Sequence, residues 1–341
     1  MGALTATVRS GTQWFLVEDS AATGTVRRAA MQLASRLGFS EHRAAEVGIV
    51  ASEASSNLVA HATRGSVGLQ VALRHELPGV QLIAVDHGPG MADVGLSATD
   101  GYSTSGTLGV GLGAIRRLAT TFDIDSASGR GTVLVAGMWA DPAPSVTDYD
   151  IGGLTRPIAG EEFCGDAIAD RSVGPVHLLM LVDGLGHGPL AADAAQQALS
   201  TFYGGQESEP KDVVAAIHRH LNHTRGAAAA VVALDQGYTT ARMAGIGNVG
   251  AYICEGGRRR EMSSMPGIVG HQMRQVRQFE YGLEPDSIVV MHSDGLHSRW
   301  DLAASPGLVR RSAGLIAAAL LRDAASKPDD ASILVLRRAP R

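Results

Sequence analysis

The chain contains 341 residues, of which 45% are hydrophobic and 18% charged, enough for a buried core in each of two globular domains. This composition excludes disorder as a description of the whole chain. The net charge is −5 and no run of basic residues occurs, which argues against a nucleic-acid or anionic-membrane binder.

The longest apolar run, Ala227 to Leu234, is far shorter than the roughly 20 residues that cross a bilayer. The first residues do not show the charged and apolar pattern of a signal peptide. The two cysteines form neither a disulfide framework nor a zinc motif. We therefore expect a cytoplasmic protein with no membrane or nucleic-acid partner.

Hydrophobic patterns predict an α/β domain over residues 1–140, a linker with two prolines over 141–150, and a second domain over 151–341. In chain order, the elements predicted before the linker are a strand at 13–17, helices at 22–37 and 41–62, strands at 68–74 and 80–86 joined by Pro78-Gly79, a helix at 114–121 and a strand at 131–139. Those predicted after it are strands at 177–182, 228–234, 239–245, 250–255, 287–292 and 332–336, and helices at 189–203, 210–224 and about 308–325. The second half therefore indicates antiparallel sheets flanked by helices.

The second predicted helix carries a carboxylate and an amide on one face. Glu53 and Asn57 lie four residues apart, so they share that face. Such a pair could hold a hydroxyl or water and a Mg²⁺ ion, which prefers oxygen ligands. Alone, the pair could equally be a solvated helix face.

Two glycine-rich segments accompany that helix. Asp86, followed by Gly88 and Gly90 at a predicted strand end, could accept a hydrogen bond from an exocyclic amine while backbone approaches a flat ring. The loop 106–113 leads into a helix, where glycine amides suit phosphate oxygens. Residues 109–114 also fit a dinucleotide fingerprint, but no clear strand precedes them. The order and spacing of the three segments indicate one nucleotide site.

These segments resemble the N, G1 and G2 boxes of the GHKL (Bergerat) ATP-binding fold, and above all the RsbT-type switch kinases of bacterial stressosome pathways. The resemblance covers almost all of residues 10–140, including the runs 37–39, 100–104, 108–112, 122–126 and 129–132. It implies an α/β sandwich with serine/threonine protein kinase activity on small STAS-domain proteins. It also implies roles for particular residues: Asn57 binds Mg²⁺, Glu53 orients or deprotonates the acceptor hydroxyl, Asp86 reads adenine, and ATP is further held by Gly88, Gly90, Gly109, Gly111, Gly113 and Thr132.

The second half carries aspartates at turn-like positions. Asp183-Gly184 and Asp294-Gly295 each follow an apolar strand, whereas Asp-Gly elsewhere is an ordinary surface turn. Converging carboxylates repel one another unless a cation neutralises them, so an oxygen-ligand metal centre is the economical explanation. Two Mg²⁺ or Mn²⁺ ions could activate a water and hold a phosphoryl group.

Asp183-Gly184-Leu185-Gly186-His187-Gly188, Ser293-Asp294-Gly295 and Asp329-Asp330 resemble motifs of metal-dependent serine/threonine phosphatases of the SpoIIE and RsbX type, as does the run 162–166. The resemblance spans about residues 150–338 and implies an α-β-β-α sandwich. It implies that Asp183 bridges two Mn²⁺ or Mg²⁺ ions, with the Gly184 carbonyl as a further ligand. The resemblance places Asp294 and Asp329 on one side of this two-metal centre and Asp166 nearer the other side. It favours Asp329 over Asp330 as the metal ligand.

Several motifs are given structural interpretations instead. Residues 245–250 spell a dinucleotide fingerprint but lie between two predicted strands, so a β connection is expected. A helical cluster of His218, His220 and His223 lacks acidic partners and is assigned to a solvated face. Cys164 is expected to be a small buried residue, and for His187 both a phosphate contact and a helix-entry role stay open.

The sequence thus predicts a fusion of a switch kinase and a phosphatase acting in partner-switching stress signalling. STAS-domain stressosome or anti-sigma-antagonist-like proteins are the predicted partners, and a downstream phosphatase or regulator is a further candidate. The alternatives are an ATP-binding domain that only gates the phosphatase, and an anti-sigma-like docking module. The intact Glu53 favours the kinase, since ATP binding alone does not require a carboxylate there.

Overall fold

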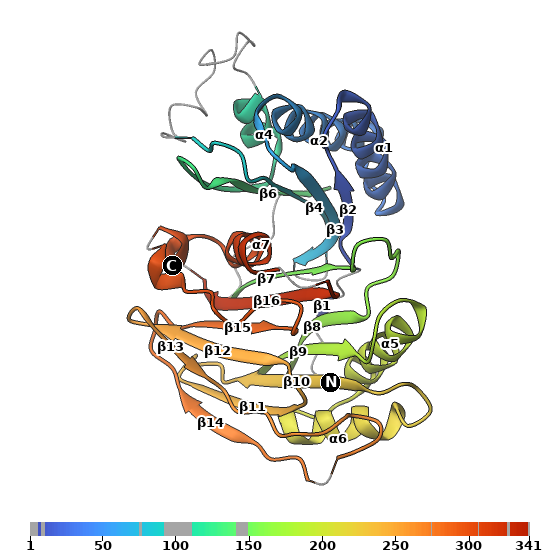
Figure 1. Cartoon of the computed structure of the whole chain (residues 1–341), viewed down its shortest axis with the longest axis vertical. Helices are drawn as coiled ribbons and strands as arrows, with labels where there is room; N and C mark the ends of the chain where they lie inside the picture. The colour runs from blue at the N-terminus through green and yellow to red at the C-terminus, as the bar shows by residue number, and fades with distance from the viewer. Residues whose placement is uncertain are drawn as a thin grey trace. The chain divides into compact units, whose positions relative to one another are not determined.

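The computed structural model describes residues 6–7, 11–74, 77–91, 111–140, 149–273, 275–305, 307–325 and 328–339. The chain forms two compact units, one of Thr12–Ser145 and the other of Met1–Gly11 with Val146–Arg341 (Figure 1). None of the helices in these ranges is both long enough and apolar enough to cross a bilayer.

The first unit is a five-stranded antiparallel sheet, in the order β2-β3-β4-β6-β5, covered by helices. Its elements are β2 (Gln13–Leu16), α1 (Ser20–Arg36), α2 (Glu41–His61), β3 (Ser66–Arg74), β4 (Leu77–Val85), α4 (Gly111–Leu118), β5 (Thr121–Ala127) and β6 (Gly131–Trp139). The side chains of Asp19 and Ser40 accept hydrogen bonds from backbone N–H groups in the first turns of α1 and α2, which fixes where each helix begins.

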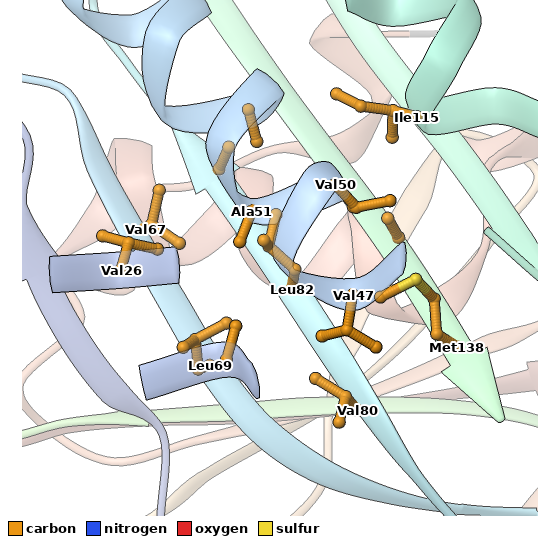
Figure 2. Close-up of a cluster of buried hydrophobic side chains, with 14 of the residues drawn as sticks. Val26, Val47, Val50, Ala51, Val67, Leu69, Val80, Leu82, Ile115 and Met138 are labelled. Carbon is orange, nitrogen blue, oxygen red and sulfur yellow. The ribbon is translucent and has the colours of Figure 1, made fainter. Parts of the chain in front are cut away.

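The core of this unit lies between the sheet and helices α1 and α2. Val47 and Val50 of α2 are fully buried among side chains of the sheet such as Leu82 and Met138 (Figure 2). Ala54 and Leu58 continue the same buried stripe at helical spacing, as the sequence predicts. The stripe fixes the rotation of α2 and therefore the direction in which its polar residues face.

The predicted turn at Pro78-Gly79 is wrong. Both residues lie inside β4, where Pro78 pairs with Leu73 and Gly79 with Ala72. Gly79 is explained by packing, because a Cβ at this position would come within 2.6 Å of the Trp139 ring. The glycine makes room for a large side chain on the neighbouring strand and does not turn the chain.

The second unit is an α-β-β-α sandwich of two antiparallel sheets. The six-stranded sheet has the order β1-β8-β9-β10-β11-β14 and the five-stranded sheet the order β13-β12-β15-β16-β7. Helices α5 and α6 pack on the first sheet and α7 on the second, and one core lies between the sheets. The elements are β1 (Ala6–Thr7), β7 (Tyr149–Arg156), β8 (Asp166–Val173), β9 (Val176–Gly184), α5 (Pro189–Gly204), α6 (Pro210–His220), β10 (Ala227–Leu234), β11 (Thr240–Ile246), β12 (Gly250–Glu255), β13 (Arg258–Glu261), β14 (Phe279–Gly282), β15 (Ile288–His292), η1 (Leu302–Ala304), η2 (Leu308–Arg310), α7 (Ala313–Ala324) and β16 (Ala331–Arg338).

Two connections differ from the expectations. Residues 141–148 of the predicted linker lie outside the described residues, whereas Tyr149 and Asp150 already belong to β7. The segment 245–250 is a β connection, but β11 and β12 belong to different sheets, so it crosses between the layers of the sandwich. Gly247 at its centre has φ +95°, a conformation that favours glycine.

Candidate functional site

The first candidate site lies on the polar face of α2. Glu53 and Asn57 are half-buried, and both reach the first residue of α4. A Cβ on Gly111 would come within 3.0 Å of Glu53 Oε2 and 3.3 Å of Asn57 Oδ1. The two side chains therefore face the start of the helix that follows the glycine-rich loop.

The same face of α2 continues to the segment after β4. His61 lies four residues beyond Asn57, and a Cβ on Gly88 would come within 2.8 Å of the His61 carbonyl oxygen. Asp86 is buried at the end of β4, and its Oδ1 accepts a hydrogen bond from the Gly88 N–H at 2.6 Å. The structure thus places the carboxylate and the glycine loop beside the end of the helix that carries Glu53 and Asn57.

Strand β6 closes this segment from the other side. The Asp86 backbone N–H donates to the Thr132 carbonyl at 3.0 Å, so these two predicted nucleotide contacts are neighbours. Gly90 and Gly131 have φ of +68° and +73°, and a Cβ would clash with the Ala127 carbonyl at the first and with the Asp86 carbonyl at the second. Both glycines are required by close backbone approach.

Of the three predicted glycines in the second loop, Gly111 and Gly113 open α4. Gly109 lies outside the described residues. The predicted contacts therefore fall into two described groups, Glu53 with Asn57 and Gly111, and Asp86 with Gly88 and Thr132, joined by one face of α2.

The second candidate site lies at strand ends of the sandwich. Asp166 is the first residue of β8 and pairs directly with Asp183, near the end of β9. Asp294 follows β15, and Asp329 precedes β16, the strand paired with β15. The four predicted metal-binding aspartates therefore come from two pairs of adjacent strands.

Electrostatic interactions connect these carboxylates. Burial raises the pKa of Asp183, and the charges of Asp166, Asp294, Asp329 and Asp330 raise it further. Burial also raises the pKa of Asp166, while the nearby Ser293 and Ser332 hydroxyls partly offset the effect. Repulsion of this kind favours protonation, or a bound cation in place of the proton.

Asp329 and Asp330 have different environments. The Asp330 carboxylate is buried and accepts hydrogen bonds from the N–H groups of Ile158 and Gly165, both at 2.7 Å. Asp329 is half-buried and accepts one hydrogen bond, from the Asp330 N–H at 2.9 Å. The Asp330 carboxylate therefore binds two segments of backbone by hydrogen bonds. Because those hydrogen bonds already occupy Asp330, they support the choice of Asp329 as the predicted metal ligand.

Asn248 is a residue at this site that the sequence analysis passed over. Its Nδ2 donates a hydrogen bond to Asp294 Oδ2 at 2.7 Å and so orients that carboxylate. The sequence signal for this residue is the glycine-rich run 245–250, in which Asn248 is the one polar side chain. Asn248 comes from the connection that crosses between the sheets.

A divalent cation fits the donor set, although the ligands are not gathered into a cage. Both carboxylate oxygens of Asp166 are buried without a hydrogen-bond partner of ordinary geometry among the described residues, a costly state for an anion unless a cation is bound. Within the same part of the chain, no three His, Cys, Asp or Glu side chains already stand in metal-binding geometry. The ligand assignments of Asp166, Asp183, Gly184, Asp294 and Asp329 therefore stay predictions.

The histidines and the cysteine have local partners. His187 Nδ1 pairs with Glu161 Oε1 at 3.0 Å, beside the aspartates. His218 is half-buried and accepts a hydrogen bond from the Gly270 N–H at 2.9 Å, so it does not belong to a solvated face. Cys164 is half-buried and not fully buried as expected, but desolvation and the nearby Asp166 and Asp330 charges raise the pKa of its thiol, which disfavours a role as nucleophile.

Comparison with known proteins assigns a family to each unit. Residues 16–138 match the family described as histidine kinase-like ATPase domain, and residues 176–339 match the family described as stage II sporulation protein E (SpoIIE). The serine/threonine-protein kinase RsbT of Bacillus subtilis (strain 168) is 33% identical over 132 residues, which cover 39% of this chain and 94% of RsbT.

Two solved structures share the fold over a little more than half of the chain. One, described as "The bacterial stressosome: a modular system that has been adapted to control secondary messenger signaling", is 28% identical with a TM-score of 0.52, covering 56% of this chain and all of that one. RsbX in complex with magnesium is 16% identical with a TM-score of 0.51, covering 57% of this chain and 98% of that one.

The folds and the family matches define a two-domain chain that joins a kinase-type ATPase unit to a SpoIIE-type phosphatase unit. The chain belongs to the RsbT-type histidine kinase-like ATPase family and continues into a SpoIIE-type phosphatase domain.

Proposed function

We propose that the chain adds phosphate to and removes phosphate from serine or threonine residues of partner-switching proteins. The unit Thr12–Ser145 would be the ATP-dependent kinase, and the unit of Met1–Gly11 with Val146–Arg341 would be the phosphatase. The observation that carries the proposal is the presence of two polar arrangements in one chain: Glu53 beside Asn57 at Gly111, and aspartates at the ends of two strand pairs.

In the kinase unit, Asn57 would supply its amide oxygen to the Mg²⁺ of Mg²⁺-ATP. Glu53, one helical turn away on the same face, would accept the proton of the acceptor hydroxyl. The buried Asp86 would receive the adenine amine, with Gly88, Gly90 and Thr132 lining the base. The amides of Gly109, Gly111 and Gly113 would surround the phosphates at the start of α4.

In the phosphatase unit, two Mn²⁺ or Mg²⁺ ions, when bound, would supply a water of lowered pKa and polarise the phosphoryl group. Asp183 would hold both ions, an assignment supported by the charges of Asp166, Asp294, Asp329 and Asp330, which all act on its carboxylate. Asp166 and the Gly184 carbonyl would be ligands on one side of the two-metal centre. Asp294, which is oriented by Asn248, and Asp329 would be ligands on the other side.

STAS-domain proteins of stressosome or anti-sigma-antagonist type are the proposed substrates, in the cytoplasm. The identity to RsbT across 94% of that kinase supports the partner class for the first unit. The 28% identity to a stressosome structure supports the same signalling setting. A downstream phosphatase or regulator is a second proposed partner of the kinase unit.

The direct test uses the full chain with γ-labelled ATP and candidate STAS-domain proteins, with Mg²⁺ alone and then with added Mn²⁺. We expect label on serine or threonine of the partner, followed by its loss as inorganic phosphate when Mn²⁺ is added. Tight ATP binding without label transfer would instead support the docking module that gates the phosphatase. Release of phosphate from a labelled partner in excess chelator would contradict the metal-dependent step.

A further inference from the structure

Exposed hydrophobic side chains of the phosphatase unit gather beside its acidic site. Among the described residues of this unit, the large hydrophobic side chains left exposed are Phe163 at 51%, Leu185 at 37% and Leu190 at 57%. Phe163 lies three residues before Asp166, Leu185 follows Asp183 on the turn before α5, and Leu190 is the second residue of α5. We call these three residues the apolar rim.

The two segments that carry the rim are held against each other. His187 pairs with Glu161 at 3.0 Å, and a Cβ on Gly165 would come within 2.7 Å of the Ala191 Cβ. A Cβ on Gly188 would likewise approach the Glu161 carboxylate at 3.2 Å. These contacts fix the backbone that carries the apolar rim, at the start of β8 and the end of β9. Because the rim side chains are exposed and do not belong to the core, their clustering is typical of an interaction site.

An exposed arginine without an anionic partner lies next to the rim. Arg225 Nη1 is 3.1 Å from the position that a Cβ on Gly186 would take, so the guanidinium covers the turn between Leu185 and His187. Within the described chain it forms no hydrogen bond or ion pair. A guanidinium left unpaired at Gly186, three residues after Asp183, is suited to a ligand anion, and its fork geometry matches phosphate.

The backbone of Arg225 is fixed relative to the acidic site. The Leu185 N–H donates to the Gly226 carbonyl at 3.0 Å, and Gly184 pairs with Ala227 in the sheet. Gly226 has φ +81°, and a Cβ there would come within 2.8 Å of the Val269 carbonyl oxygen. The strand end that supplies Asp183 therefore also positions Arg225.

We propose that Arg225 and the apolar rim form the substrate-docking surface of the phosphatase, and that it takes a phosphoserine or phosphothreonine flanked by apolar side chains on a protein segment. Arg225 binds the phosphate dianion, which the acidic site alone would repel. The rim binds the apolar neighbours of the phosphorylated residue, whose burial stabilises the complex in proportion to the area covered. The inference rests on the proposed phosphatase function and adds its substrate class.

The test compares two nine-residue phosphoserine peptides of equal charge, one with leucine and one with serine on both sides of the phosphoserine. With the Mn²⁺-loaded full chain, we expect kcat/KM to be about tenfold higher for the leucine peptide. The double variant Phe163→Ser, Leu190→Ser should reduce that preference to about twofold, mainly through KM. Leu77→Ser, at an exposed leucine of the other unit, is the matched control.

Arg225→Ala should raise KM for both peptides about tenfold or more and raise the inhibition constant of inorganic phosphate by a similar factor. Arg225→Lys should recover part of both losses, because it keeps the charge but not the fork. Arg258→Ala, at an exposed arginine on β13, is the control for charge. Because the substituted side chains are exposed, melting temperatures should stay within about 1–2 °C of the parent.

The docking proposal is overturned if the wild type shows no preference between the peptides, or if Arg225→Ala behaves like Arg258→Ala. It is also overturned if the rim variant changes the mass measured by light scattering but keeps the peptide preference, because the rim would then cover a second copy of the chain. If the wild type with Mn²⁺ hydrolyses neither the peptides nor p-nitrophenyl phosphate, the phosphatase function itself fails, and the docking proposal with it.

Discussion

At the scale of single residues, helix α2 carries its buried core side chains and its polar candidate-site side chains in two adjacent stripes. Val47, Val50 and Ala54 point into the core, whereas Glu53 and Asn57 point towards Gly111. At about 3.6 residues per turn the two sets are centred roughly 70° apart around the helix axis, about a fifth of a turn, so the packing that fixes the first also fixes the second. A small change at either polar residue should therefore affect chemistry and leave the fold intact.

Glu53→Gln and Asn57→Ala should produce different losses. We expect Asn57→Ala to lose Mg²⁺-ATP binding by at least about tenfold, because an oxygen ligand is removed. Glu53→Gln should keep most nucleotide affinity and lose about 100-fold or more in phosphoryl transfer, because the proton acceptor is removed. Nucleotide binding by calorimetry and transfer from labelled ATP separate the two effects, with Glu41→Gln on the same helix as control. Wild-type transfer by Glu53→Gln would exclude the proton-acceptor role.

Asp183→Asn should abolish Mn²⁺-dependent hydrolysis and flatten the pH dependence of stability without metal. Burial and then the neighbouring carboxylates raise the pKa of Asp183 above its ordinary value of 3.8. Between the ordinary pKa and the raised pKa, the folded state keeps a proton that the unfolded chain has released. The free energy of unfolding therefore falls as pH rises from the ordinary value towards the raised one. In chelator, the melting transition that responds to Mn²⁺ should move to lower temperature between about pH 5 and 8.

The variant should show a smaller slope, with the remainder contributed by the buried Asp166, and should melt higher near pH 8 by about 2–4 °C for each kcal/mol of repulsion removed. Excess Mn²⁺ should raise the melting temperature of the wild type and leave that of Asp183→Asn nearly unchanged. Calorimetric scans across pH, with and without chelator, measure both effects. A wild-type transition in chelator that rises with pH would contradict the raised pKa.

At the scale of secondary-structure elements, the turn between β5 and β6 offers a matched pair of glycines. Gly129 and Gly131 have similar positive φ of +79° and +73°, but a Cβ on Gly129 meets nothing within 4 Å, whereas one on Gly131 clashes with the Asp86 carbonyl. Gly129→Ala should cost about 1 kcal/mol from backbone strain. Gly131→Ala should cost roughly 2 kcal/mol more and should weaken ATP binding by displacing Asp86.

Chemical denaturation and nucleotide titration of both variants measure the two effects. Equal costs for the two substitutions would mean that the close approach of β6 to Asp86 does not constrain the site.

The elements that hydrophobic periodicity could predict are those with one dominant buried face. Helices α1, α2 and α5 and strands β6, β10 and β12 lie within a few residues of their predicted ranges. Strand β8 was not predicted, because Asp170 and Arg171 are charged yet almost fully buried. Arg171 donates to the carbonyls of Gly205 and Glu207, partners that are visible only once the sheet and the loop after α5 are assembled.

The candidate sites likewise contain residues that could be predicted from local sequence and residues that could not. Spacing along α2 and the order of the aspartates could be read from sequence, because each depends on local geometry. Asn248, the backbone hydrogen bonds of Asp330 and the position of Arg225 depend on contacts between strands that are distant in the chain. Such contacts follow from register, which the sequence does not state.

At the scale of the whole molecule, one chain carries two opposed activities. Running both without control would only hydrolyse ATP, so we expect binding at one unit to change the properties of the other. The chain from the end of β6 at Trp139 to the start of β7 at Tyr149 would span at most about 35 Å when extended, which limits how far the two strand ends can separate. Control of this kind requires that nucleotide or partner bind two states of the chain unequally.

A nucleotide bound to the first unit should therefore change phosphatase activity of the second. Coupling free energies of about 1–3 kcal/mol correspond to changes of 5–150-fold in affinity, so KM for p-nitrophenyl phosphate or the apparent affinity for Mn²⁺ should shift within that range. The small substrate excludes competition for a docking surface on the kinase unit.

The measurement compares the full chain with and without a non-hydrolysable ATP analogue, and Asn57→Ala should abolish the response. By linkage, saturating the phosphatase unit with Mn²⁺ should change the affinity for the analogue by the same factor as the analogue changes the affinity for Mn²⁺. Identical constants with and without the analogue, in a protein shown to bind it, would mean that the fusion only keeps the two enzymes together.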